Sequence, residues 1–317
     1  MRFYYRVHNL IINSSQPLPE LREVKPQIAD VLIDETVVLP HLLGEYITKG
    51  VVFSNELTYE HAGNQLLLQF NGVGRVLLSG GIRMEVEADP GVGWEELKLY
   101  LLGSGLGFLL LQRGVFPFHG STVVIDNFGA IMFIGPSGVG KSTLATKFVQ
   151  EGHQLLSDDV TVFEPNLHKP GLVYSGVCRV KLWNDSIQRL AYRRQEYSFI
   201  LPGWEKKHLL FGEEIEQTEV PLRGIYCLSP SDKAQIIIHE LDTLQKINSL
   251  MLNTYREMGV EMLSLQQPHF EWCVQVAKTI PIKRIERPVN TFEIDNLYET
   301  IMSDISAQFV ENEQSKI

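Results

Sequence analysis

Cysteine is scarce in this sequence, which has three in 317 residues. Cys178, Cys227 and Cys273 are isolated from one another, odd in number and without the spacing of metal ligands. A small secreted domain held by disulfides would be far richer in cysteine, and a zinc site would need paired ligands. The scarcity therefore excludes both classes and favours a reducing cytoplasm.

Positive charge is also in short supply. Lys and Arg number 28 against 38 Asp and Glu, which gives a formal net charge of −10. A protein that binds nucleic acid through a general basic surface needs the opposite balance. We therefore expect no nucleic-acid partner, and a neutral or basic peptide matches this surface better as a substrate.

Long apolar runs are absent as well. The most apolar segment, Trp94–Gln112, is interrupted by Gly103, Gly105 and Gly107. A membrane-spanning helix needs about 20 consecutive apolar residues, so we expect a buried helix, or two short ones, with glycines at sites of close packing. The first 15 residues lack the apolar core and cleavage site of a signal peptide. No membrane association is predicted.

What the sequence does have is a phosphate-binding loop pattern. Residues 135–142, GPSGVGKS, match G-x-x-x-x-G-K-[ST]. The run Ala130–Ile134 predicts a strand before the loop, and Lys141–Glu151 predicts a helix after it, ended by Gly152. Glycines let backbone N–H groups converge on phosphate oxygens, and the helix N-terminus adds its positive dipole end. The predicted nucleotide-binding residues are Gly135, Pro136, Ser137, Gly138, Val139, Gly140, Lys141, Ser142 and Thr143.

The types of the last residues of the loop predict their chemistry. A lysine at position 141 would reach the β and γ phosphates, and the Ser142 hydroxyl would bind Mg²⁺. ATP and Mg²⁺ are therefore the expected cofactors.

Two adjacent carboxylates follow the predicted helix. Asp158 and Asp159 lie in Gln154–Phe163, which we predict to be a single strand. A strand, a short helix and a strand so closely spaced form a compact crossover, which would bring the pair beside the loop. One carboxylate could hold Mg²⁺ and the other could accept a proton from an attacking hydroxyl. The alternative is that two aspartates merely end a strand at a turn.

A histidine precedes the loop on a predicted hairpin. Ser121–Ile125 and Ala130–Ile134 flank the turn-rich residues 126–129, DNFG. If Asp126 pairs with Gly129, antiparallel register brings His119 opposite Pro136. An imidazole there could tune a carboxylate or touch the γ phosphate, although a purely structural histidine is the alternative.

Together these motifs resemble the catalytic domain of the HPr kinase/phosphorylase family. The resemblance is carried by Phe118–Gly120, the phosphate loop and Gly152–Asp159, and it covers about Gln112–Glu164. It implies an α/β fold with a phosphate-loop kinase core of the HPr kinase/PEP carboxykinase-like type, and a serine protein kinase activity. The glycine-rich signature that the family carries after the acidic strand has no clear counterpart here.

The resemblance also implies a role for each residue of the motifs. Lys141 and Ser142 would bind phosphate and Mg²⁺. Asp158 would accept the proton, Asp159 would bind the metal, and His119 would support the acidic pair.

A second resemblance concerns the amino-terminal part. Pro17–Pro19 and Gln112–Gly114 are similar to HPr-kinase-related proteins encoded beside peptide-modification genes, some of which phosphorylate a lasso-peptide precursor. This implies a precursor peptide as the acceptor.

The chain is expected to have two parts. Residues 1–90 are a β-rich module, because short strand-like runs alternate there with Gly, Pro, Asn and Ser. Residues 91–317, which include the helical segment 94–112, would form the catalytic domain. The strand-like runs are Phe3–Ile12, Ala29–Ile33, Val51–Tyr59, Gln65–Phe70, Val76–Leu78 and Ile82–Glu87.

The carboxyl-terminal third carries weaker signals. The polar stretch Tyr192–Glu219 is a candidate lid, and Arg193, Lys206 or Lys207 could reach the transferring phosphoryl group. The alternative for each is a solvated charged face. Further strands are expected at Leu222–Leu228, Ala234–His239 and Ile282–Ile285. Helices are expected near Ser186–Arg194 and at Thr243–Tyr255, Pro268–Lys278 and Ile294–Phe309.

These patterns predict a nucleotide-dependent phosphotransferase, and the resemblance implies an ATP-dependent kinase that transfers the γ-phosphoryl group of Mg-ATP to a serine hydroxyl of a protein or peptide. Two alternatives stay open, a small-molecule hydroxyl kinase and an ATP-binding regulator without transfer activity. A homo-oligomer is compatible with the sequence.

Overall fold

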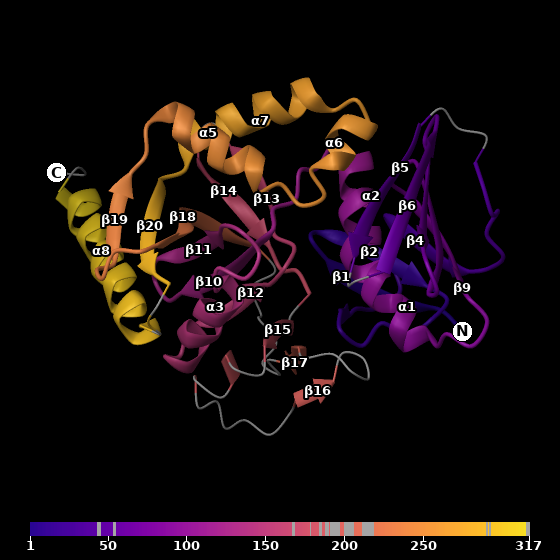
Figure 1. Ribbon diagram of the computed structural model, residues 1–317, viewed down its shortest axis with the longest axis horizontal. Coiled ribbons are helices and arrows are strands. Elements are labelled where there is room, and N and C mark those ends of the chain that lie inside the picture. Colours follow the sequence, from indigo (N-terminus) through magenta and orange to yellow (C-terminus); the bar gives the residue numbers. More distant parts are fainter. Residues whose placement is uncertain are drawn as a thin grey trace.

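The structure is a computed structural model, and it describes residues 1–42, 46–52, 55–166, 169–177, 179–183, 186–187, 190, 197–199, 206–210, 219–289, 291 and 293–314. Two large sheets with their helices lie side by side (Figure 1). The predicted α/β class with a β-rich amino-terminal part is confirmed.

The amino-terminal sheet has nine strands in the order β3-β1-β2-β4-β9-β8-β7-β6-β5. The run 3–12, predicted as one strand, is a hairpin, because His8 and Asn9 have φ of 49° and 62° and reverse the chain. The run 51–59, also predicted as one strand, belongs to two strands, because Val52 at the end of one pairs with Asn55 at the start of the next. The strands are β1 (Phe3–Val7), β2 (Leu10–Ser14), β3 (Arg22–Glu23), β4 (Val31–Glu35), β5 (Tyr46–Val52), β6 (Asn55–Ala62), β7 (Gln65–Phe70), β8 (Gly74–Ser79) and β9 (Arg83–Ala88).

The apolar segment after this sheet forms two short helices, as expected. They are α1 (Trp94–Tyr100) and α2 (Leu106–Gln112), joined by a π-helical turn, η1 (Leu101–Gly105). Their apolar side chains share one hydrophobic cluster with the nine-stranded sheet. By packing, the helices therefore belong with the sheet, and the division of the chain at residue 90 stays a prediction. Within the described ranges, no helix is both long and apolar enough to cross a membrane.

The second sheet positions the candidate site. Strand β10 lies between β12 and β11, and the long strand β18 runs parallel to β11 and β20. The other neighbouring strands of this second sheet run antiparallel to each other. A separate small sheet has the order β15-β17-β16. The strands are β10 (Gly120–Ile125), β11 (Gly129–Ile134), β12 (Gln154–Ser157), β13 (Val162–Asn166), β14 (Lys169–Tyr174), β15 (Arg179–Trp183), β16 (Tyr197–Phe199), β17 (Lys206–Leu210), β18 (Glu219–Ser231), β19 (Ile237–Glu240) and β20 (Ile282–Pro288).

Helices cover both faces of this sheet (Figure 1). α3 (Lys141–Gln150) and α8 (Ile294–Gln314) bury Leu144, Phe148 and Ile301 on one face. α5 (Thr243–Leu252) and α7 (Gln266–Thr279) bury their apolar side chains on the other. A short helix, α6 (Met258–Met262), was not predicted and lies between them in the sequence.

Two local predictions around the site are corrected. The segment 154–163 is two strands, because the chain turns at Asp158–Asp159, where Asp159 has a φ of 72°. The β10–β11 hairpin pairs Ile125 with Gly129, so its loop has three residues, 126–128, instead of two. A helix predicted near Ser186–Arg194 lies mostly outside the described residues.

Candidate active site

The phosphate-loop residues lie between the end of β11 and the start of α3, as the pattern predicted. Gly135 has a φ of 144°, and a Cβ built on it would lie 2.5 Å from the backbone oxygen of Leu228. Only glycine fits there without displacing β18. Gly138 has a φ of 80°, and a Cβ built on it would project into open space. The loop is therefore a backbone cradle that remains open on one side.

Lys141 lies across this cradle. Its side chain is buried, and Nζ donates hydrogen bonds to the backbone oxygens of Gly135 at 2.8 Å and Pro136 at 3.1 Å. These bonds hold the ammonium group at the rim of the loop, where a phosphate could replace the carbonyl oxygens as its partner.

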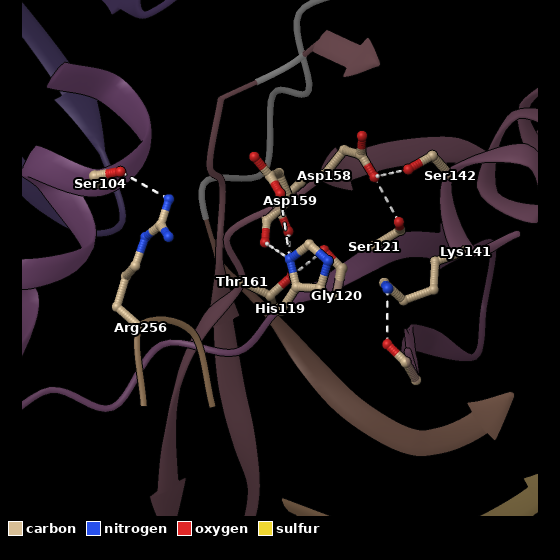
Figure 2. Close-up of polar contacts among 12 residues, drawn as sticks. Ser104, His119, Gly120, Ser121, Lys141, Ser142, Asp158, Asp159, Thr161 and Arg256 are labelled. Atoms are coloured by element: carbon tan, nitrogen blue, oxygen red, sulfur yellow. Dashed lines mark hydrogen bonds and ion pairs between the residues drawn. The ribbon is translucent and has the colours of Figure 1, made fainter. Parts of the chain in front are cut away.

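Asp158 contacts the loop through Ser142. Its Oδ1 atom accepts a hydrogen bond from Ser142 Oγ at 2.9 Å and another from Ser121 Oγ at 2.5 Å (Figure 2). The residue is only 5% exposed. The prediction that the acidic pair lies beside the loop is thus met for Asp158. Ser121, on β10, was not predicted as part of the site.

Asp159 has a different neighbour. Its Oδ1 atom lies 3.2 Å from His119 Nδ1, and its backbone oxygen lies 3.3 Å from the same nitrogen. The side chain is 26% exposed, so a molecule in solution can reach it. Asp159 has a left-handed backbone, and its carboxylate faces His119 while that of Asp158 faces Ser142. In a continuous strand the two side chains would instead point to opposite faces of the sheet.

Backbone contacts fix the place of His119. The register of β10 and β11 pairs Gly120 with Ile134, so His119 is next to Gly135, one residue from the predicted partner. Its N–H donates to the Asn253 backbone oxygen at 2.8 Å, and its ring stacks on Tyr255 with 5.9 Å between centroids. Burial raises the Tyr255 pKa to about 12, so the phenol keeps its proton at neutral pH.

Two arginines near the site were missed by the sequence analysis. Arg287, at the carboxyl end of β20, has Nη2 3.6 Å from a Cβ built on Gly140. Burial lowers its pKa, and its Nε atom is buried without a hydrogen-bond partner among the described residues. The predicted strand ended at Ile285, and the parallel pairing of β18 with β20 carries the chain on to Arg287. Arg256 is the second arginine, on the opposite side of His119 and Asp159 from Lys141 (Figure 2).

Of the candidate lid, 192–219, the structure describes only 197–199, 206–210 and 219. Arg193 lies outside the described residues, and of Lys206 and Lys207 only the backbone, in β17, is described. Their predicted contact with phosphate stays a prediction.

The residues present suit a magnesium–nucleotide complex. Mg²⁺ prefers hydroxyl, carboxylate and phosphate oxygens and is usually held by one or two carboxylates together with the substrate. Ser142 and Asp158 supply a hydroxyl and a carboxylate in mutual contact, at the edge of the open glycine cradle. Lys141 and Arg287 place positive charge on the same loop.

Comparisons with known proteins point to one family over short segments. The chain is 49% identical over 45 residues to the HPr kinase/phosphorylase of Prosthecochloris aestuarii, which is 14% of this chain and 13% of that protein. It is 41% identical over 70 residues to the HPr kinase/phosphorylase of Chlorobium phaeobacteroides, 22% of this chain and 20% of that protein. The chain thus matches a fifth or less of the length of these relatives.

A solved structure gives a weaker likeness, and no family model matches the chain. The Hpr(Ser) kinase/phosphatase from Coxiella burnetii has 14% sequence identity and a TM-score of 0.35, over 63% of this chain and 96% of that one. The resemblance predicted from the motifs is confirmed by the two sequence relatives, and it is confined to the segments that they match.

Proposed function

We propose that this protein is an ATP-dependent phosphotransferase that phosphorylates a serine hydroxyl of a protein or peptide. The observation that carries the proposal is the convergence of Lys141, Ser142, Asp158, Asp159 and His119 around one glycine cradle. Phosphoryl transfer depends mainly on positioning and on charge stabilisation, and these five side chains supply both.

The loop side of the site would bind the nucleotide. Backbone N–H groups of residues 135 and 137–143, at the N-terminus of α3, would donate hydrogen bonds to the phosphate oxygens. Lys141 and Arg287 would offset the negative charge that develops on the transferring group. Mg²⁺, when bound, would add charge neutralisation at the β and γ phosphates.

The contacts favour one assignment of the two carboxylates. The family resemblance gives Asp158 the base role and Asp159 the metal role. In the structure, however, Ser142 contacts Asp158, and Asp158 is almost fully buried. We therefore assign Ser142 and Asp158 to the metal side, and the more exposed Asp159, paired with His119, to the acceptor side.

The serine Oγ attacks the γ phosphorus, its proton passes to an Oδ atom of Asp159, and the bond from phosphorus to the β–γ bridging oxygen breaks with its electron pair leaving on ADP. His119 orients the Asp159 carboxylate for this proton transfer.

The acceptor class rests on the relatives and on surface charge. Two relatives are named as kinases of the protein HPr, and the net charge of −10 suits a neutral or basic peptide better than a nucleic acid. A ribosomally made precursor peptide is the finer proposal, and the cytoplasm, where such peptides and ATP occur, is the proposed location.

A transfer assay tests this proposal. The purified protein is incubated with Mg²⁺ and [γ-³²P]ATP, and HPr, the peptides encoded beside its gene or small hydroxyl compounds are offered as acceptors in separate reactions. Label on a serine, absent with Asp159→Asn and retained with Asp232→Asn, is the expected result. Asp232 is an exposed aspartate after β18 and serves as the matched control. Label on a small hydroxyl compound alone, or bound ATP without any transfer, would contradict a protein or peptide kinase.

A further inference from the structure

Arg256 is a cation at the contact between the two large sheets and their helices. It lies between α5 and α6, and its φ of 57° is in the left-handed region that arginine seldom adopts. Nη2 donates a hydrogen bond to Ser104 Oγ at 2.7 Å (Figure 2), and the guanidinium carbon lies 5.0 Å from the centre of the Tyr255 ring. The guanidinium is thus held by the Ser104 hydroxyl at its end and by the Tyr255 ring at its face.

The part that holds Arg256 comes from the amino-terminal unit. Ser104 is in the π-helical turn η1, is 1% exposed and packs with the helices on the nine-stranded sheet. Gly107, one turn further on, leaves room for Tyr255, because a Cβ built on it would lie 2.7 Å from that ring. π-helical turns and left-handed non-glycine residues are both costly and are frequent at functional sites. Here Ser104, in a π-helical turn, and Arg256, a left-handed residue other than glycine, are joined by one hydrogen bond.

The same contact reaches the acidic pair. Tyr255 stacks on the ring of His119, and His119 contacts Asp159. Burial disfavours the charged guanidinium, but Tyr255, Tyr59 and Asp159 outweigh it and raise the Arg256 pKa. The cation is therefore coupled electrostatically to the carboxylate that we place on the acceptor side.

Arg256 has no carboxylate in contact. Within the part of the chain that the structure describes, no Asp or Glu oxygen lies within 4.0 Å of its guanidinium, and its Nε atom is buried without a hydrogen-bond partner. Tyr255, Tyr59 and Asp159 stabilise the charge, but the buried Nε donor has no acceptor among the described residues, and a buried donor without an acceptor is costly. Lys141 and Arg287, which we assign to the nucleotide phosphates, lie at the glycine cradle.

We propose that Arg256 binds a carboxylate of the acceptor polypeptide, close to the serine that is phosphorylated, and that Ser104 positions it. The inference rests on the proposed function. In an in-line transfer the attacking and leaving oxygens lie on opposite sides of the phosphoryl group, so a cation beyond Asp159 faces the acceptor. A guanidinium fork matches a carboxylate with two parallel hydrogen bonds.

The substrate class follows from this placement. The acceptor is a peptide or protein segment with an Asp or Glu side chain near its serine. Because the whole chain is strongly negative, the rest of the segment is neutral or basic. The amino-terminal unit is then part of the acceptor site, since it supplies Ser104.

A serine-centred peptide library tests the proposal. Each flanking position is varied among Asp, Glu, Asn and Gln, and transfer from Mg-[γ-³²P]ATP is measured for the full-length protein. We expect at least about tenfold higher kcat/KM with an acidic residue at one position, as for a hydrogen-bonded charge pair. Arg256→Gln removes this preference, Ser104→Ala weakens it, and Ser104→Thr, which keeps the hydroxyl, restores it. Arg83→Gln, an exposed arginine on β9, keeps it.

The other outcomes separate the inference from the proposed function. Peptide labelling without any acidic preference, or a preference that survives Arg256→Gln, overturns the inference and leaves the kinase. An equal loss of kcat on all peptides with Arg256→Gln places the guanidinium on the transferring phosphoryl group instead, which also overturns it. Bound ATP with no peptide labelled overturns the proposed function and the inference with it. If Arg256→Gln does not fold, the test compares the preference for an acidic residue in Ser104→Ala with that in Ser104→Thr.

Discussion

Ser142 Oγ donates a hydrogen bond to Asp158 Oδ1 at 2.9 Å, and this contact joins the phosphate loop to the acidic turn. The two residues belong to α3 and to the turn after β12. Strand β10 lies between β11 and β12 in the sheet, so both strands end at the same edge and bring their following residues together. In the proposed assignment, this pair would hold Mg²⁺, and Asp159 with His119 would face the acceptor.

Replacement of each aspartate by asparagine should affect a different property of the transfer reaction. Asp159→Asn should keep ATP binding and lose about 10²–10⁴-fold in kcat, the range for removal of a general base. Asp158→Asn should instead raise the Mg²⁺ concentration needed for half-maximal rate, because an amide is a poorer magnesium ligand than a carboxylate. Mg²⁺ titrations of the transfer rate for both variants measure this. If Asp158→Asn loses transfer at every Mg²⁺ concentration and Asp159→Asn shifts only the Mg²⁺ requirement, the family assignment is right and ours is reversed.

Lys141 should be needed for nucleotide affinity. Its ammonium group is held at the rim of the loop by two carbonyl oxygens, so Lys141→Ala removes a charge-assisted partner of the phosphates. We expect a loss of about tenfold or more in ATP affinity, on the scale of one hydrogen bond to a charged group. Calorimetric titration with Mg-ATP measures it, with the exposed Lys233→Ala as the control. Equal affinities of the two variants would show that Lys141 does not contact the nucleotide.

The sequence predicted that the loop, the acidic pair and His119 lie near one another, but it missed Arg256 and Arg287. The loop, the acidic pair and His119 lie within one stretch, Phe116–Glu164, where local patterns and a single hairpin decide what meets. Arg256 and Arg287 reach the site only through the packing of α6 and the pairing of β20 with β18, and neither position carries a local signal. Tertiary contacts between segments far apart in the sequence are not encoded in periodicity.

Turns account for most of the errors in the fold. The period of two in the β-rich part was read correctly, and Gln65–Phe70 matches β7 residue for residue. The hairpin turn at His8–Asn9 was missed because Asn-Gly and Asp-Gly are the expected turn pairs. The strand across Asp158–Asp159 was broken by a left-handed aspartate, which the alternation of side chains does not reveal.

Gly107 should be intolerant of a side chain. A Cβ there would lie 2.7 Å from the Tyr255 ring, so Gly107→Ala forces the contact between the two units apart. Overpacking of this kind costs about 1–3 kcal/mol, and we expect urea unfolding to show such a loss together with reduced transfer. Gly93→Ala is the control, because a Cβ on Gly93 meets nothing within 4 Å. Equal free energies of unfolding for the two variants would mean that this contact is looser than described.

His8 should make the protein less stable in mild acid. The imidazole is fully buried in the β1–β2 turn without a hydrogen-bond partner among the described residues, and burial lowers its pKa to about 3. Between that value and about 6.5, the unfolded chain binds a proton at His8 that the folded protein does not bind. The free energy of unfolding therefore falls with decreasing pH in this window, by up to about 1.4 kcal/mol per pH unit.

Burial also lowers the pKa of His153 and His269, which adds to the same trend, so the test compares two proteins that share those groups. His8→Asn keeps a residue that tolerates a positive φ at the turn and removes the titrating ring. Urea unfolding at pH 7 and pH 5 should show a loss for the native protein that exceeds the loss for the variant by about 2 kcal/mol. Equal losses would mean that His8 already accepts a proton in the folded protein, and that the turn opens to water before the rest of the chain unfolds.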